Sequence, residues 1–289
     1  MNSYEELQDR TASDSLTLLQ LVGVPRSMST VLGRVLNENN RPSVYVSEPF
    51  NRDTSDPEEA ARLILNAYHG TVPHDAVKPV IITKNMASYM SPEAFSMMEN
   101  IASFTIWNIR HPYVQLGSLL TRIVNDLKVG AGEDEIDQRD IFPYLDEACD
   151  FLENSSKSQN YSKTGWQAID EHSKQSPLSI RFAVDGYEVI EDTIDCINAI
   201  CEQVGFEYTP TMISNWKKGF INIVNRNNVE ETSRSAWTSK VAQSTGILAV
   251  QRASLDILTL PKGLKEHIQT TALPVYNRLK LHTLSTTGS

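Results

Sequence analysis

The sequence predicts an α/β fold in which a parallel sheet is covered by helices on both faces. Short apolar runs alternate along the chain with segments whose apolar residues recur at helical spacing, and this alternation is typical of βαβ units. The runs are rich in Leu, Ile and Val, as expected for buried strands. The 289 residues are ample for a large core, and we expect a single domain that spans residues 1–289.

Five apolar runs are predicted strands: Leu18–Val24, Val44–Ser47, Pro79–Thr83, Phe104–Ile109 and Ser179–Val184. Four helices are expected between them, near Ser29–Glu38, Pro57–His69, Pro92–Glu99 and Tyr113–Val124. The helix at Pro57 has a favourable first turn, because proline is followed by two glutamates.

Further along, an apolar stripe predicts another helix that ends at Gly205; the stripe consists of Ile190, Ile194, Ile197, Cys201 and Val204. Residues 130–160 are instead polar, acidic or rich in Ser and Asn, which predicts a helical insert with mobile flanks, of the kind that often serves as a lid. We expect residues 283–289 to be a disordered tail.

The composition favours a soluble cytoplasmic enzyme. The net charge of −10 argues against nucleic acid or an anionic membrane as a partner. The amino-terminal residues are polar and acidic rather than a signal peptide, and no apolar run is long enough to cross a membrane. Three cysteines in no metal-binding spacing indicate reduced thiols, and the histidines show no ligand spacing, so we expect no metal.

Residues 16–34 form the most informative segment: an apolar strand, a short polar turn and then a helical pattern. The first amides of such a helix point into the turn and bind anions. When the ATP-binding P-loop template is laid on Gly23, its second glycine falls on Met28 and its lysine on Ser29, and only Thr30 fits. Arg26 is the one cation of the turn. The sequence therefore predicts a P-loop-like sheet whose loop is ill suited to ATP or GTP hydrolysis.

A second motif follows the strand Phe104–Ile109, where the chain continues Arg110-His111-Pro112. The helix after it has an apolar stripe, and Ser118 lies off that stripe, eight residues after Arg110. An arginine fork with a hydroxyl suits a phosphate monoester. For Arg110 by itself, an exposed arginine at a strand end would be the default interpretation.

Together, these motifs resemble the sulfotransferases that use 3′-phosphoadenosine-5′-phosphosulfate (PAPS). The resemblance implies that the 5′-phosphosulfate is held by the loop Pro25-Arg26-Ser27-Met28-Ser29-Thr30. It also implies that Arg110 and Ser118 bind the 3′-phosphate. Two positions depart from the family pattern: Met28 stands where glycine is usual, which restricts the turn, and His111 replaces the more usual aspartate.

The resemblance extends to the later part of the chain. Tyr187 follows the fifth predicted strand and matches a tyrosine that packs near the adenine, although a structural tyrosine at a strand end is nearly as good an interpretation. Residues 234–246 occupy the place of the family's late basic cofactor loop, but its common Arg-Lys-Gly form is absent. Arg234 and Lys240 are therefore only candidates for closing over the 3′-phosphate.

The resemblance also implies a catalytic base. Ser47-Glu48-Pro49 is similar to the Glu-Pro sequence of the family branch that uses glutamate, so Glu48 is the predicted base, and His111 is held in reserve. A surface glutamate before a proline turn is the alternative. Lys84 ends the third strand, where the family carries a basic residue, and with Arg26 it would neutralise charge on the bridging oxygen.

The function implied by the resemblance is transfer of a sulfuryl group from PAPS to a hydroxyl or nitrogen of a small-molecule acceptor. The short chain looks similar to tailoring sulfotransferases of specialised metabolites such as alkaloids. Two alternatives stay open: a nucleotide kinase or NTPase with an atypical P-loop, and a catalytically inactive sulfotransferase-like binding protein. Nothing in the sequence predicts the oligomeric state.

Overall fold

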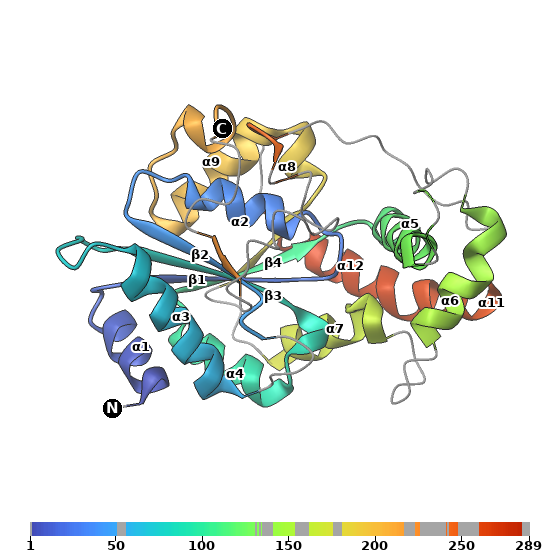
Figure 1. Cartoon of the computed structure of the whole chain (residues 1–289), viewed down its shortest axis with the longest axis horizontal. Helices are drawn as coiled ribbons and strands as arrows, with labels where there is room; N and C mark the ends of the chain where they lie inside the picture. Colours follow the sequence, from blue (N-terminus) through green and yellow to red (C-terminus); the bar gives the residue numbers. More distant parts are fainter. Residues whose placement is uncertain are drawn as a thin grey trace.

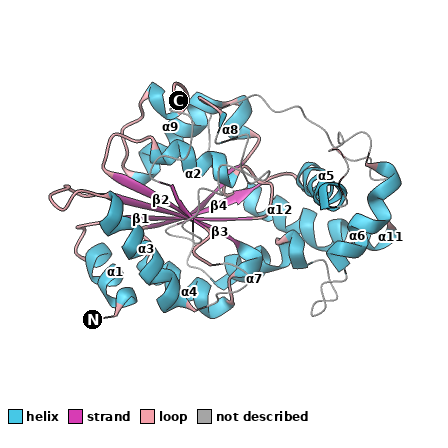
Figure 2. Cartoon of the chain, in the orientation of Figure 1, coloured by secondary structure: helices cyan, strands magenta, loops and turns pink. Residues whose placement is uncertain are grey.

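The structure is a computed structural model of the chain, and it describes residues 2–50, 56–130, 132, 134, 141–153, 162–175, 181–216, 223–225, 241, 243–247 and 260–284. Within these residues, six strands form one sheet in which every neighbouring pair is parallel (Figure 2). They are β1 Thr17–Gly23, β2 Ser43–Ser47, β3 Val80–Met86, β4 Phe104–Ile109, β5 Arg181–Asp185 and β6 Ile223–Asn225. The predicted α/β class is confirmed.

The strand order is β5-β4-β1-β3-β2-β6, which places β1 between β3 and β4. The five predicted strands correspond to β1 through β5, although β3 continues to Met86 rather than ending at Thr83. β6 was not predicted, because three residues are too few to show a pattern. At the carboxyl ends, Gly23 pairs with Met86 on one side and with Asn108 on the other. The segments that follow these strands therefore meet at one edge of the sheet, where parallel α/β sheets bind their ligands.

Helices cover both faces of the sheet (Figure 1). Their bounds are α1 Ser3–Ala12, α2 Ser29–Asn37, α3 Pro57–Thr71, α4 Pro92–Ile101, α5 Pro112–Gly130, α6 Leu145–Glu153, α7 Trp166–Gln175, α8 Glu188–Glu191, α9 Thr193–Val204, α11 Lys262–His267 and α12 Leu273–Lys280. Helices α1, α3, α4, α7 and α12 share one apolar cluster with the sheet, whereas α2 and α9 share another on the opposite face. Alternate residues of β1 serve the two faces, since Leu18 and Val22 join the first cluster and Leu19 and Leu21 the second.

A third apolar cluster lies beside the sheet and joins α5, α6 and α11 (Figure 1). Helix α6 belongs to the predicted insert 130–160, and it packs Leu145, Cys149 and Leu152 into this cluster. The lid role of the insert stays a prediction. All three cysteines are buried, and none forms a disulfide. Of the predicted tail, Thr283 forms an isolated bridge with Ala183, and residues 285–289 lie outside the described residues.

The helix predicted from residue 190 onward is wrong at its beginning. Its proposed core position Ile194 is 55% exposed. The reason is a break at Asp192, whose backbone is not helical (φ −115°, ψ 43°) and which separates the short α8 from α9. The predicted core positions Ile197, Cys201 and Val204 are confirmed, and Cys196 and Ile200 are buried beside them. Gly205 ends the helix in the left-handed conformation, as predicted.

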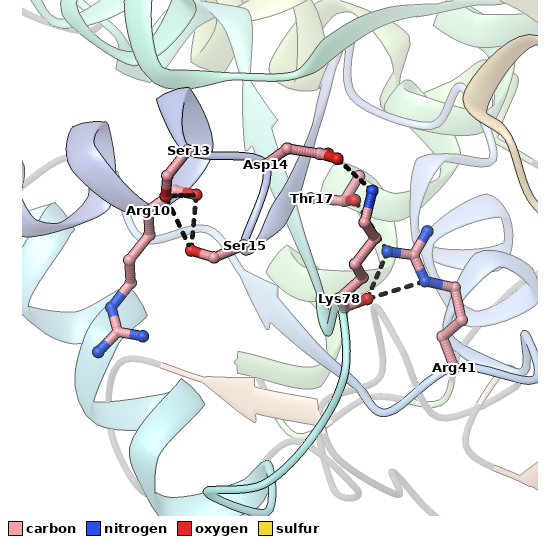
Figure 3. Close-up of polar contacts among 7 residues, drawn as sticks. All are labelled: Arg10, Ser13, Asp14, Ser15, Thr17, Arg41 and Lys78. Atoms are coloured by element: carbon pink, nitrogen blue, oxygen red, sulfur yellow. Dashed lines mark hydrogen bonds and ion pairs between the residues drawn. The ribbon is translucent and has the colours of Figure 1, made fainter.

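Polar contacts tie together the segments at the amino ends of β1, β2 and β3, on the far side from the edge described above (Figure 3). Lys78 pairs with Asp14, and Arg41 donates from Nε to the Lys78 carbonyl at 2.8 Å and from Nη2 to Thr17 Oγ1 at 3.0 Å. Nearby, the hydroxyl of Ser15 caps the Arg10 carbonyl at 2.9 Å. These exposed pairs contribute little individually and mainly fix the loops.

Candidate functional site

The loop between β1 and α2 has an unusual backbone for its sequence. Arg26 and Met28 both adopt positive φ angles, of 65° and 71°, and Met28 is the left-handed residue that precedes the first turn of α2. Glycine is the usual residue in this conformation, which costs other L-residues about 1–2 kcal/mol. The methionine thus does not prevent the turn that we expected it to restrict. Neighbouring contacts must hold this strained conformation in place.

Hydrogen bonds of three side chains fix the loop to the neighbouring elements. The Ser27 hydroxyl donates to Asn108 Oδ1 at 2.8 Å, so in this structure Ser27 fixes the loop to β4. Gln115 of α5 donates from Nε2 to the Pro25 carbonyl at 2.7 Å, and Trp166 in turn donates to Gln115 Oε1 at 3.1 Å. The loop is therefore fastened to β4, α5 and α7 together.

Two glycines allow the loop to lie directly against the sheet. A Cβ atom on Gly186, just after β5, would lie 2.6 Å from the Ser27 carbonyl oxygen and 3.1 Å from Met28 Cγ. A Cβ atom on Gly23 would lie 2.9 Å from both the Asn108 carbonyl oxygen and Ser27 Oγ. Neither site has room for a side chain, so the Met28 side chain packs on the backbone of Gly186.

Arg26 and Arg110 lie together over this loop. Arg26 donates from Nε to Ser118 Oγ at 3.0 Å, and Arg110 donates from Nη1 to the Arg26 carbonyl at 3.1 Å. Burial, with the positive charges of Arg110 and Arg122, lowers the pKa of Arg26 to about 10. Burial also lowers the pKa of Arg110. Both guanidinium groups stay charged at neutral pH, so the site has a positive potential next to the amino end of α2, an arrangement that binds anions.

Behind Arg110, a buried carboxylate organises the segment after β5. Asp185 accepts from the Tyr276 hydroxyl at 2.6 Å, from Lys280 Nζ at 3.2 Å and from the Tyr187 amide at 3.0 Å. Burial raises the pKa of the Tyr276 phenol, and the nearby Asp185 carboxylate raises it further. The Arg110 guanidinium lies over the Tyr187 ring, 5.6 Å from its centroid. Tyr187 therefore lies beside Arg110, the residue predicted to bind the 3′-phosphate, and the contact of Tyr187 with adenine stays a prediction.

On the other side of β1, Glu48 and Lys84 form an ion pair. Lys84 lies on β3 and Glu48 directly follows the neighbouring β2; Ser47 pairs with Lys84 in the sheet, and the Glu48 amide donates to the Lys84 carbonyl at 2.7 Å. The Lys84 side chain is 3% exposed, whereas that of Glu48 is 33% exposed. Glu48 has a positive φ of 55°, which turns the chain sharply before Pro49. The pair thus presents a partly accessible carboxylate backed by a buried ammonium group.

Tyr45 lies between the Glu48–Lys84 pair and helix α2. Its hydroxyl lies close to Thr30, Ser47 and the Glu48 carboxylate, and burial raises its pKa further above its ordinary value. Its ring packs so closely on α2 that a Cβ on Gly33 would lie 2.6 Å from it. Thr30 and Glu48 are therefore neighbours of the same phenol, although they are far apart in the sequence.

His111, the reserve base, packs on the opposite side of the site from Glu48. Its ring lies 5.2 Å from that of Tyr276 and 5.5 Å from that of Tyr113, measured between centroids. Burial lowers the pKa of His111, and nearby Asp185 partly opposes this shift. The lowered pKa favours the neutral form of the ring, and His111 directly follows Arg110 in the sequence.

The predicted site residues thus fall into two groups at one edge of the sheet: the loop with Arg26, Arg110, Ser118 and Tyr187, and the pair Glu48–Lys84. The predicted contacts Arg234 and Lys240 lie outside the described residues.

Among the described residues, no group of His, Cys, Asp or Glu could hold a metal ion, and no helix is long and apolar enough to span a membrane. Sequence reasoning missed Gln115 and Asp185. A charged residue at the end of an apolar strand could have indicated Asp185, whereas nothing distinguishes Gln115 from a surface glutamine.

No family model and no curated protein sequence matches the chain. Among solved structures, the chain is similar to the sulfotransferase domain from the curacin biosynthetic pathway (11% identity, TM-score 0.47), covering 88% of this chain and 96% of that one. It is also similar to the sulfotransferase domain from the Synechococcus PCC 7002 olefin synthase, with 13% identity, a TM-score of 0.44 and coverage of 88% and 94%.

A third similar structure is mouse sulfotransferase SULT7A1 complexed with PAP, with 11% identity, a TM-score of 0.41 and coverage of 73% of this chain and 67% of that one. These neighbours are sulfotransferases, the family that the sequence motifs resemble. At such identities and TM-scores, they assign a role to no residue of this chain.

Proposed function

We propose that this protein is a sulfotransferase that uses PAPS and transfers its sulfuryl group to a hydroxyl or nitrogen of a small molecule. The observation that carries the proposal is the placement of Arg26, Arg110 and Ser118. Two largely buried guanidinium groups and a hydroxyl lie together at the amino end of α2, joined by contacts of 3.0 and 3.1 Å. The carboxylates of Asp126 and Asp185 partly offset these two charges, and an anionic ligand would offset them further.

The donor set suits a nucleotide with two separate anionic groups. The amides of the first turn of α2, with Arg26, suit the 5′-phosphosulfate, because such amides have no partner within the helix. Arg110 and Ser118 suit a phosphate monoester, which accepts several hydrogen bonds at once. The lysine of the ATP-binding template is absent from the loop, and this difference favours PAPS over ATP.

The pair Glu48–Lys84 suits the chemical step. When bound, PAPS supplies an activated sulfuryl group on a phosphate leaving group. Glu48 would accept the proton of the acceptor hydroxyl or amine while the new bond to sulfur forms. Lys84 and Arg26 would stabilise the negative charge on the phosphate oxygen as its bond to sulfur breaks. The carboxylate can reach an acceptor because a third of its side chain is exposed.

The acceptor proposal is a small specialised metabolite, with an alkaloid as one example, and the proposed location is the cytoplasm. It is supported by the net charge of −10, which disfavours nucleic acid and anionic membranes as partners. A screen of small hydroxyl and amine compounds with labelled PAPS tests it directly. Labelled product from none of them, with a nucleic acid or polysaccharide labelled instead, would contradict it.

Calorimetry with the product nucleotide PAP (adenosine 3′,5′-bisphosphate) tests the donor. Binding of PAP without magnesium is expected, whereas binding of ATP only with Mg²⁺ would indicate a kinase or NTPase. Arg110→Ala should weaken PAP binding by roughly 1.5–3 kcal/mol, the range for a charged hydrogen bond. Adenosine 5′-phosphosulfate lacks the 3′-phosphate, so its binding should change far less. Equal losses for both ligands would remove the assignment of Arg110.

A further inference from the structure

A third arginine lies at the edge of the proposed anion site. Helix α5 runs from Pro112 to Gly130, and residues spaced by four lie on one face of a helix. Ser118, which accepts from Arg26, is therefore followed on the same face by Arg122 and then by Asp126. The positive charge of Arg122 contributes to the lowered pKa of Arg26, and the negative charge of Asp126 partly opposes this shift, so both members of the pair are electrostatic neighbours of Arg26.

The surroundings of Arg122 differ from those of an ordinary surface arginine. Its side chain is only 12% exposed, although that of its partner Asp126 is 41% exposed. Asp126 therefore neutralises Arg122 from the solvent side, where water competes for the carboxylate. A phosphate dianion can replace this carboxylate, because it offers more charge and more acceptor oxygens.

We propose that Arg122 is a further nucleotide-binding residue, which contacts the same phosphate as Arg110 and Ser118 and which Asp126 holds in place when no ligand is bound. This inference rests on the proposed function. It gives the phosphate an arginine from α5 in addition to Arg110, in a chain whose later segment lacks the Arg-Lys-Gly sequence. The ligand class is a nucleotide that carries a phosphate in addition to its 5′ group.

Binding of PAP and of adenosine 5′-phosphosulfate is measured by calorimetry for four variants of the full chain. Arg122→Gln should weaken PAP binding roughly ten- to a hundredfold, as expected for one charge-assisted hydrogen bond, and change binding of the other ligand less than threefold. Arg122→Lys keeps the charge and should recover part of this loss. Asp126→Asn removes the competing carboxylate, so PAP should bind several-fold more tightly, which a folding defect would not produce.

Arg10→Gln is the matched control. Arg10 pairs with Glu6 at 2.8 Å with the same four-residue spacing on α1, which has no residue in the site, so neither ligand should be affected.

Two results overturn the inference while leaving the proposed function intact: a change below twofold for PAP in Arg122→Gln when Arg110→Ala loses binding, or equal losses for both ligands in Arg122→Gln. Weaker PAP binding in Asp126→Asn also overturns it. Failure of the unmodified protein to bind PAP overturns the proposed function and this inference together.

Discussion

Replacing Glu48 by glutamine separates its catalytic role from its structural one. The substitution keeps the shape of the side chain but removes both the proton acceptor and the counter-ion of Lys84. Turnover should fall by about 10²–10⁴, the usual contribution of a general base. The loss should lie in kcat while PAP still binds, because the group acts only as the acceptor proton moves.

The effect on stability follows from the exposure of the two partners. Removing one partner of a fully buried ion pair costs about 3–5 kcal/mol, whereas an exposed pair contributes about 0–1 kcal/mol. Lys84 is 3% exposed and Glu48 is 33% exposed, so the pair lies between these limits. We expect Glu48→Gln to lower the free energy of unfolding by about 2 kcal/mol, since a buried ammonium group then lacks its carboxylate.

A second substitution tests this reasoning. Lys84→Met removes the charge and keeps a side chain of similar length, so the double variant should recover at least half of the lost stability without recovering turnover. Urea unfolding and single-turnover transfer from labelled PAPS measure the two effects. A double variant less stable than the single one would refute the electrostatic argument. Near-full turnover in Glu48→Gln, with none in His111→Asn, would reassign the base to His111.

Three further predictions concern the scaffold of the site. Burial lowers the pKa of His267 to about 4. As the pH falls, His267 is therefore protonated in the unfolded chain before it is protonated in the folded one. Up to about 3 kcal/mol of the free energy of unfolding is lost between pH 6.5 and pH 4, and urea unfolding should show a smaller loss in His267→Gln. Gly186→Ala should reduce both stability and PAP affinity, because its Cβ would meet a loop carbonyl at 2.6 Å, whereas Gly70→Ala has open space and should be neutral or slightly stabilising in thermal melts. Tyr276→Phe removes a 2.6 Å hydrogen bond to buried Asp185 and should lower the free energy of unfolding by about 1–3 kcal/mol, whereas an unchanged urea midpoint would contradict its importance.

The strands near the site were predictable because each is a short apolar run followed by a polar turn. The same patterns placed Arg26, Arg110 and Glu48 after three different strands, and the parallel sheet then brought these residues to one edge. Periodicity failed where the chain breaks, since the non-helical backbone of Asp192 separates α8 from α9 and leaves Ile194 exposed. Helix α1 was missed because its sequence is mostly polar, with Leu7 its one buried residue.

The contacts that hold the site were not predictable. Gln115 binds the Pro25 carbonyl although the two residues are 90 positions apart in the sequence, and Trp166 in turn binds Gln115. No local sequence pattern predicts such long-range contacts. The left-handed Met28 contradicts local preference, and it is held in place by Gly186, which comes from the far end of the sheet order. Close packing between distant segments decided these conformations, rather than the preferences of neighbouring residues.

The order of the strands has a consequence for how such a protein can change during evolution. Arg110 follows β4 on one side of β1, whereas Glu48 follows β2 on the other side, with β3 between. Under the proposed function, the residues that bind the donor and those near the acceptor are thus encoded by separate stretches of one gene. Mutations after β2 can admit a new acceptor while the nucleotide remains bound as before, so new products can arise without rebuilding the costly anion site.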